Sequence, residues 1–154
     1  MLPTDIEKLI SRLPESAAPF LSFKAHSVKS LRKVFLDDSL SDQLLVIGSD
    51  GAGNPICIKA RDDTKVILLE HENRFEPKHM NNGIDELIKF IAIYSQHVEK
   101  IQAAINADAW LDGAYDISYV HELEKRMRQT SESALIENSF WYEALRDERA
   151  NLKQ

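Results

Sequence analysis

The chain has 154 residues and a formal net charge of −6, with 44% apolar and 29% charged residues. This length suits one domain, and the apolar fraction is sufficient for a hydrophobic core without disulfides or metal. No apolar run approaches the ~20 residues of a membrane-spanning helix. Asp5 and Glu7 stand where a secretory signal would be basic and then apolar. We therefore expect a cytosolic protein with no membrane partner.

Charge and cysteine content exclude further classes of protein. The chain holds 19 basic and 25 acidic residues, and the acidic excess is present both before and after Pro77. A nucleic-acid-binding protein needs a basic face to neutralise phosphates, so a cationic partner is the better electrostatic match. The single Cys57 cannot form an intrachain disulfide or a cysteine zinc site, and no two histidines have the i, i+4 spacing of helical metal ligands. We expect no metal and no cofactor.

The N-terminal third gives weak patterns. Apolar residues at helical spacing predict a short helix from about Asp5 to Arg12, which Pro14 ends. The segment from Glu15 to Phe23 predicts a further turn or two of helix, limited by Pro19. Residues 28–42 show no clear period.

A β-meander is predicted over about residues 43–70. Three short runs rich in β-branched residues, 44–47, 56–58 and 66–69, are separated by turn sequences that contain Asp50-Gly51 and Asp62-Asp63. Two of these runs are apolar at both odd and even positions, so the sheet should be covered on both faces. An edge segment is expected near Phe75 to Met80.

Helices dominate the remainder of the sequence. Asn81-Asn82-Gly83 is expected to cap a long amphipathic helix from Ile84 to about Ile105. After a polar stretch, Ser118 can cap a second helix, and Asn138 or Ser139 a third. The expected fold class is α+β: an antiparallel or mixed sheet covered by helices, in one domain over 1–154, with 106–154 a helical C-terminal extension. We expect the extension to pack on the body through three residues: Phe140, Trp141 and Leu145.

No catalytic motif assembles from the sequence. The glycines after the first meander strand lead into the strand at Pro55, whereas a phosphate-binding loop must lead into a helix. Asp50 and Asn54 lack the alternating ligands of a calcium loop. Cys57, between two isoleucines, fits a small buried hydrophobe. His71 with Glu72 is the best candidate for a base, although a strand-end histidine is usually structural.

Carboxylates in and beside the predicted turns are the remaining candidates. Turns at one edge of a meander lie close together, so some of them could form an acidic rim that binds a partner, although acids also favour turns for solubility alone. The candidate partner-binding residues are Asp37, Asp38, Asp42, Asp50, Asp62, Asp63, Glu70 and Glu72.

The order of features resembles the SUKH superfamily. The resemblance is carried by LLVIGSDGAG at 44–53, the runs at 56–60 and 66–69, and Met80-Asn81-Asn82-Gly83-Ile84 ahead of the helix. Ser139-Phe140-Trp141-Tyr142 is similar to the Phe-Trp element of the fourth SUKH group. Gly83 stands where that family usually has a small hydroxyl residue.

The resemblance implies an α+β fold without catalysis. Bacterial SUKH proteins are mostly immunity proteins that neutralise a cognate polymorphic toxin, often a nuclease or a deaminase. Because nuclease grooves are basic, an acidic protein can be steered to them. Two alternatives stay open: an interaction scaffold unrelated to toxins, and a small hydrolase that uses His71 and Glu72 with Asp50.

Overall fold

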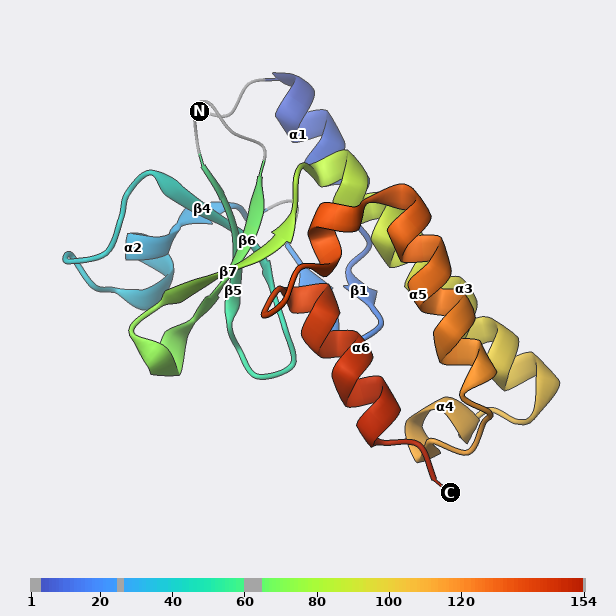
Figure 1. Ribbon diagram of the computed structural model, residues 1–154. Helices are drawn as coiled ribbons and strands as arrows, with labels where there is room; N and C mark the ends of the chain where they lie inside the picture. Colours follow the sequence, from blue (N-terminus) through green and yellow to red (C-terminus); the bar gives the residue numbers. More distant parts are fainter. Residues whose placement is uncertain (1–3, 25–26, 60–64, 154) are drawn as a thin grey trace.

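The fold is built on an antiparallel sheet. The computed structural model describes residues 4–24, 27–59 and 65–153. Seven strands in these residues form one sheet in the order β1-β2-β4-β5-β6-β7, with β3 also paired to β4. The strands are β1 (Ser16–Ala17), β2 (Leu21–Phe23), β3 (Lys29–Ser30), β4 (Leu44–Ser49), β5 (Pro55–Lys59), β6 (Val66–Glu70) and β7 (Glu76–Asn81). With the helices around it, the sheet makes an α+β fold, as expected (Figure 1).

The predicted meander is confirmed as β4, β5 and β6, and the predicted edge segment as β7. The helical prediction for Glu15 to Phe23 is wrong, because this segment forms β1 and β2. Leu21 and Phe23 are buried on either side of the exposed Ser22, which is the two-residue period of a strand. Pairing with β4 through Ser22 and Phe23 fixes the segment as extended chain.

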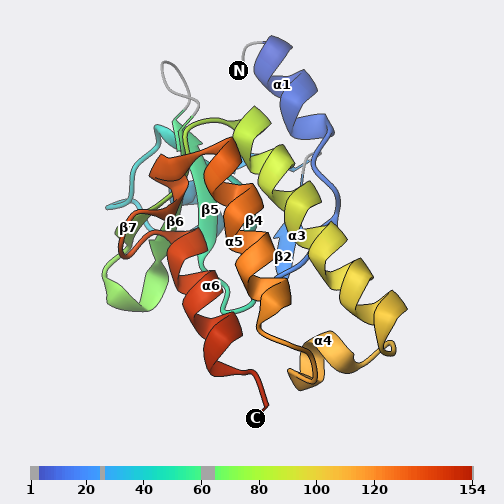
Figure 2. The ribbon, with the colours of Figure 1, turned by 45° about the vertical axis from the view of Figure 1, so that its right-hand side comes forward.

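Helices cover both faces of the sheet. They are α1 (Thr4–Ser11), α2 (Leu31–Phe35), α3 (Ile84–Ala104), α4 (Ala109–Asp112), α5 (Ser118–Thr130) and α6 (Phe140–Ala150), with 3-10 turns η1 (His71–Asn73) and η2 (Glu132–Leu135). Figure 2 shows α5 between α3 and α6, while Figure 1 shows α2 on the other side of the sheet.

Both faces of the sheet are buried, as predicted. In β5, Ile56 and Ile58 join the main core beneath the long helices, whereas Cys57 between them joins a smaller cluster with Leu31 of α2 and Leu69 of β6. All three β5 side chains are fully buried. This explains why the meander strands are apolar at consecutive positions.

Gly48 lets the first strands approach the meander. A Cβ at this position would lie 2.3 Å from the backbone oxygen of Ser22 and 2.6 Å from Cδ1 of Phe23. The register of β4 against β5 also shifts between Val46 and Gly48. A side chain at this position would therefore separate β2 from β4.

The long helix α3 is confirmed, but its predicted cap works differently. Gly83 is the N-cap residue, and its carbonyl accepts a hydrogen bond from the Leu87 N–H at 3.0 Å. Asn81 is fully buried instead: its side-chain oxygen accepts from Trp141 Nε1 at 2.9 Å and its amide donates to Glu86. Asn81 thereby joins the end of β7 to the start of α6.

The C-terminal helices pack on the body as predicted. Trp141 and Leu145 are buried, and Phe140 packs against the main core. Ser139 is the N-cap of α6 and accepts from the Tyr142 N–H, which confirms one of the two predicted caps. Ser118 does not cap α5; instead its own N–H donates to the Asp116 carboxylate at 2.9 Å.

Candidate functional site

The strand register divides the predicted acids between two ends of the sheet. Leu44 pairs with Lys59 and Ser49 pairs with Pro55, so β4 runs from one end to the other. The acids then fall into two sets: Asp37, Asp38 and Asp42 lie ahead of β4, whereas Asp50 follows β4, Glu70 ends β6 and Glu72 follows β6 at the opposite end of the sheet. Asp62 and Asp63 lie outside the described residues. Successive turns of a meander alternate between its ends, so these acids do not form one rim.

Two of these carboxylates accept hydrogen bonds from within their own turns. The Asp37 carboxylate accepts from the Ser39 hydroxyl at 2.6 Å and from the Ser39 N–H at 2.9 Å, and these bonds lower its pKa. The Asp50 carboxylate accepts from the backbone N–H groups of Ala52 and Asn54 and from the Asn54 side-chain amide. Asp50 thus shapes the β4–β5 hairpin, and its carboxylate is held in a fixed position.

His71 is oriented by an amide rather than by a carboxylate. Its Nδ1 lies 2.7 Å from Asn54 Oδ1, which also accepts from the His71 backbone N–H. The distance from His71 Nε2 to Glu72 is 3.9 Å, and the Glu72 side chain is 92% exposed. The predicted His71–Glu72 pair therefore lacks a hydrogen bond between its members. Asn54 instead links Asp50 and His71 in one chain of hydrogen bonds.

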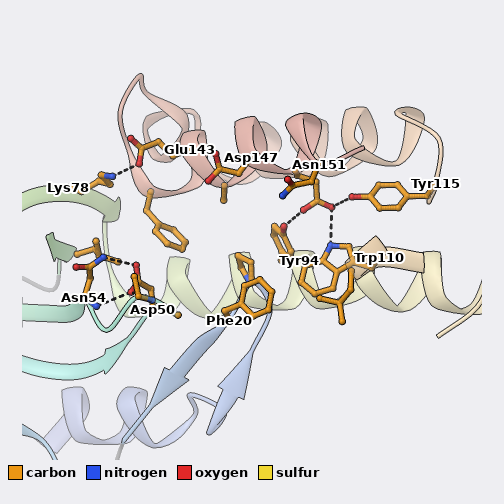
Figure 3. A pocket seen from close by; sticks show the side chains of 18 residues that line it. Phe20, Asp50, Asn54, Lys78, Tyr94, Trp110, Tyr115, Glu143, Asp147 and Asn151 are labelled. Atoms are coloured by element: carbon orange, nitrogen blue, oxygen red, sulfur yellow. Dashed lines mark hydrogen bonds and ion pairs between the residues drawn. The ribbon is translucent and has the colours of Figure 1, made fainter. Parts of the chain in front are cut away.

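A pocket of about 550 Å³ opens at the Asp50 end of the sheet. Figure 3 shows α6 along one side, with Asp147 across the pocket from Asp50 and Phe20. Tyr94 of α3, Trp110 of α4 and Tyr115 close the far end. A volume of this size is within the range of ligand-binding pockets, about 300–1,000 Å³.

Helical periodicity explains how α6 lines this pocket. Glu143, Asp147 and Asn151 recur every four residues at the end of the chain, and Phe140, Ala144 and Glu148 form the adjacent row. The remaining face carries Trp141 and Leu145 into the core. One helix therefore supplies a hydrophobic anchor, a polar row at the pocket and a second row in which Glu148 follows two apolar residues.

Glu148 is the centre of a buried hydrogen-bond network. Its Oε1 accepts from His97 Nε2 at 2.5 Å, Trp110 Nε1 at 3.0 Å and the Tyr115 hydroxyl at 2.5 Å. Its Oε2 accepts from the Tyr94 hydroxyl. The side chains of His97 and Glu148 are each only 4% exposed. Four donors from three separate segments thus converge on one carboxylate.

The network keeps Glu148 ionised. Burial alone would raise the pKa of Glu148, but hydrogen bonds from His97, Tyr115 and Tyr94 outweigh burial and lower the pKa below its ordinary value of 4.5. Burial, together with the Glu148 charge, raises the pKa of both tyrosines. Because an ionised carboxylate can only accept hydrogen bonds, the His97 Nε2 must carry a proton.

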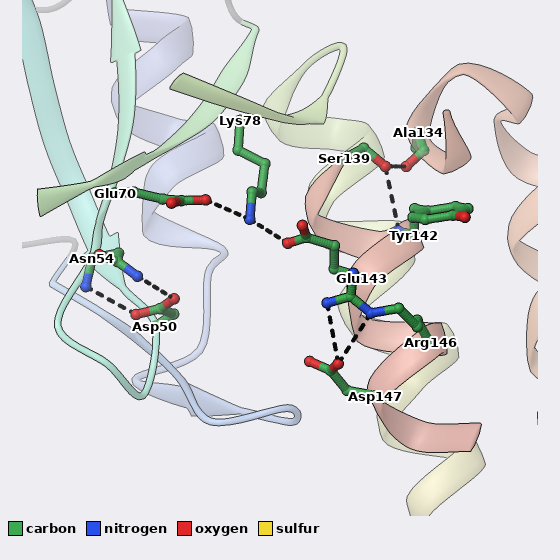
Figure 4. A network of polar contacts seen from close by, with 10 residues as sticks. All are labelled: Asp50, Asn54, Glu70, Lys78, Ala134, Ser139, Tyr142, Glu143, Arg146 and Asp147. Atoms are coloured by element: carbon green, nitrogen blue, oxygen red, sulfur yellow. Dashed lines mark hydrogen bonds and ion pairs between the residues drawn. The ribbon is translucent and has the colours of Figure 1, made fainter. Parts of the chain in front are cut away.

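A lysine bridge stands at the near end of the pocket. Lys78 Nζ lies 2.6 Å from Glu70 and also contacts Glu143 of α6 (Figure 4). Burial would lower the pKa of Lys78, but the hydrogen bonds to Glu143 and Glu70 prevail and raise it. The hydrogen bond from Lys78 also lowers the pKa of Glu70. The ammonium therefore stays charged and joins β6, β7 and α6.

The pocket has a negative balance and aromatic walls. Four carboxylates line it, those of Asp50, Glu143, Asp147 and Glu148, against the one ammonium of Lys78, a formal charge of −3. Five aromatic side chains also line it: Phe20, Tyr94, Trp110, Tyr115 and Phe140. Carboxylates combined with aromatic faces suit a cation.

Sequence reasoning missed most of this site. Of the predicted acids that the structure describes, only Asp50 lines the pocket, while Glu70 reaches it through Lys78. The network at Glu148 did carry a signal, because Glu148 follows Trp141 and Leu145 at helical spacing on the side that faces inward. A glutamate at an apolar position must find donors, and His97 occupies a similar position on α3.

The predicted burial of Cys57 is confirmed, since its side chain is fully buried, and burial raises the pKa of its thiol to about 12. No group of three or more metal-ligating side chains occurs in the described residues. Within the same residues no helix is long and apolar enough to cross a bilayer. No protein-family model, curated protein or solved structure matches the chain.

Proposed function

We propose that the protein is a non-catalytic immunity protein that binds and neutralises a cationic protein toxin. The observation that carries this proposal is the negatively charged, aromatic pocket between α6 and the β4–β5 hairpin. A toxin that acts on nucleic acid has a basic groove, and an acidic partner can be steered to it and occupy its phosphate sites.

The state of the titratable groups favours binding over catalysis. Four donors hold Glu148, and its lowered pKa makes it a weak base. The His71 ring is hydrogen-bonded to Asn54, and the Glu72 carboxylate lies beyond hydrogen-bond distance of the His71 ring. A hydrolase that uses His71 and Glu72 with Asp50 would need these groups to rearrange.

The SUKH family is part of the same proposal. The resemblance rests on the hairpin at 44–53, the helix start at 81–84 and the Phe-Trp element at 140–141. In the fold these become an antiparallel meander, the long helix α3 and the anchored helix α6. This order of elements is consistent with a SUKH immunity protein, in which binding residues are expected to vary from toxin to toxin.

The test is co-expression with the product of the gene that lies next to this one in the genome. The expected result is rescue of growth and a complex that survives purification at low salt and weakens at high salt, since charges at an interface are screened. Rescue must be lost when this chain is replaced by an unrelated acidic protein of similar size. A neighbouring product that is not toxic, or is toxic but neither bound nor neutralised, contradicts the proposal.

An interaction scaffold unrelated to toxins is the second candidate. The observation in its favour is an apolar surface on α2 and just after it, away from the pocket, where Leu36 is 91% and Val34 is 44% exposed. Exposed apolar residues of this size mark interaction sites when they are contiguous. A Leu36→Asp variant that loses a partner but keeps toxin protection would favour the scaffold at this face.

A further inference from the structure

We infer that the pocket between Phe20 and α6 receives an arginine side chain from a loop of the bound protein. This inference rests on the proposed function for its partner. Three independent features carry it: the sign of the charge in the pocket, the aromatic walls, and the exposed apolar residues at its mouth.

The charge selects a cation. Lys78 is already engaged by Glu70 and Glu143, and Asp50 is held by its hairpin. Asp147 is different, because its partner Arg146 is 3.3 Å away and both side chains are more than half exposed. Ion pairs of this exposed kind contribute little, so an incoming cation can replace Arg146 at small cost.

The walls select a flat cation. The rings of Phe20 and Trp110 lie 5.7 Å apart between centroids, and the Trp110 ring meets that of Tyr94 at 6.3 Å. A guanidinium group stacks on aromatic faces and at the same time donates to a carboxylate through a planar fork, which a lysine ammonium cannot do. Phe20 and Asp147 lie on opposite sides of the same pocket, so it offers a guanidinium both an aromatic face and a carboxylate (Figure 3).

Exposed apolar residues at the opening of the pocket favour a protein ligand over a small molecule. Phe20 and Leu111, both lining the pocket, are each 64% exposed. Exposed apolar residues beside a polar pocket are typical of protein interfaces, in which the rim is covered on binding. A volume of about 550 Å³ also exceeds a single side chain, which leaves room for the residues that flank the arginine.

The test is an NMR titration of the purified chain with a Gly-Arg-Gly peptide that is capped at both ends. Shifts should concentrate on the Trp110 side-chain N–H and on α6, and the peptide in which citrulline replaces arginine should bind at least roughly 10-fold more weakly, because citrulline has the same shape but no charge. Equal binding of the two peptides, or shifts confined to the α2 end, would overturn the inference.

Two variants localise the effect. Asp147→Asn removes the exposed carboxylate. Phe20→Asn removes the ring, and asparagine is chosen because it tolerates the backbone φ of 63° at this position. Each should weaken the arginine peptide by roughly 5- to 10-fold without lowering the melting temperature, since both side chains are exposed. The matched control is Asp38→Asn, which makes the same charge change away from the pocket. An equal loss in the control would mean that only net charge matters.

The outcomes distinguish failure of the arginine-pocket inference from failure of the proposed immunity function. If the neighbouring product is neutralised as fully by Asp147→Asn and Phe20→Asn as by the natural chain, the pocket inference is wrong and the immunity proposal stands. If the natural chain protects against no toxin but binds arginine and rejects citrulline, the proposed function fails and the pocket is established as an arginine site.

Discussion

Removal of the Glu148 carboxylate is the most direct test of the network that builds the pocket. Each hydrogen bond to a charged group contributes about 1.5–3 kcal/mol, and loss of one partner from a buried ion pair costs about 3–5 kcal/mol. Because the four bonds share one acceptor, they are not additive. We expect Glu148→Ala to lower the free energy of unfolding by about 4 kcal/mol, which for a chain of this length lowers the melting temperature by roughly 12 °C.

The Glu148→Gln variant separates charge from shape. Its oxygen can still accept from His97, Trp110 and Tyr115, so these three hydrogen bonds keep their direction, whereas the Tyr94 hydroxyl now faces an amide that donates to it. We expect about half the effect of alanine. Urea denaturation followed by circular dichroism measures both, with the exposed Glu122→Ala as a control that should change stability by less than about 0.5 kcal/mol.

The pH dependence gives a second check on Glu148. Because its folded-state pKa lies below the ordinary 4.5, the carboxylate stabilises the fold above that pH, and the stabilisation is lost as the pH falls through the folded-state pKa. The gap in stability between the natural chain and Glu148→Gln should therefore narrow below about pH 4.5. A gap independent of pH, or a loss in Glu148→Ala below about 1 kcal/mol, would refute the network as described.

Two further substitutions and one labelling experiment have definite expected outcomes. Lys78→Met should lower stability by about 1–2 kcal/mol in urea denaturation because Glu70 and Glu143 lose their cation. It should also tighten the arginine peptide in the NMR titration, and weaker binding would contradict the electrostatic argument. Cys57 should react with a thiol reagent at pH 8 only as fast as the fold opens, since it is fully buried with a pKa of about 12; rapid labelling of the native chain would disprove this. Gly113→Ala should lower the melting temperature and cost more than about 1 kcal/mol, because Gly113 has φ 65° and an added Cβ would lie 2.0 Å from the Asn151 carbonyl oxygen. An unchanged melting temperature would contradict that packing.

The elements with a strong period were predictable from the sequence. The consecutive apolar residues of the meander and the three- and four-residue steps of α3 reflect burial in the core, and burial decides the structure at those positions. Residues 16–23 were misread because each strand there is only two or three residues long, and pairing with β4 determines their conformation.

The pocket could not be predicted, because it depends on how distant segments meet. Phe20, Trp110 and Glu148 are far apart in the sequence, and none belongs to a motif. The predicted acids were chosen for their place in turns, yet a carboxylate in a turn often bonds to its own backbone, as Asp37 does. Three of the four pocket carboxylates, those of Glu143, Asp147 and Glu148, lie on α6 instead, and only the packing of this helix shows that Glu143 and Asp147 face the pocket.

Different positions of α6 hold the helix in place and line the proposed binding pocket, and this separation has a consequence for changing the ligand of the pocket. Trp141 and Leu145 hold the helix to the sheet, whereas Asp147 and Asn151 are exposed at the lip of the pocket. Substitution at the lip leaves the anchoring contacts in place, and such surface changes usually alter stability by less than about 0.5 kcal/mol. If the pocket binds a partner as proposed, its specificity can be changed by randomising a few positions of one helix, while the residues that decide whether the chain folds are left untouched.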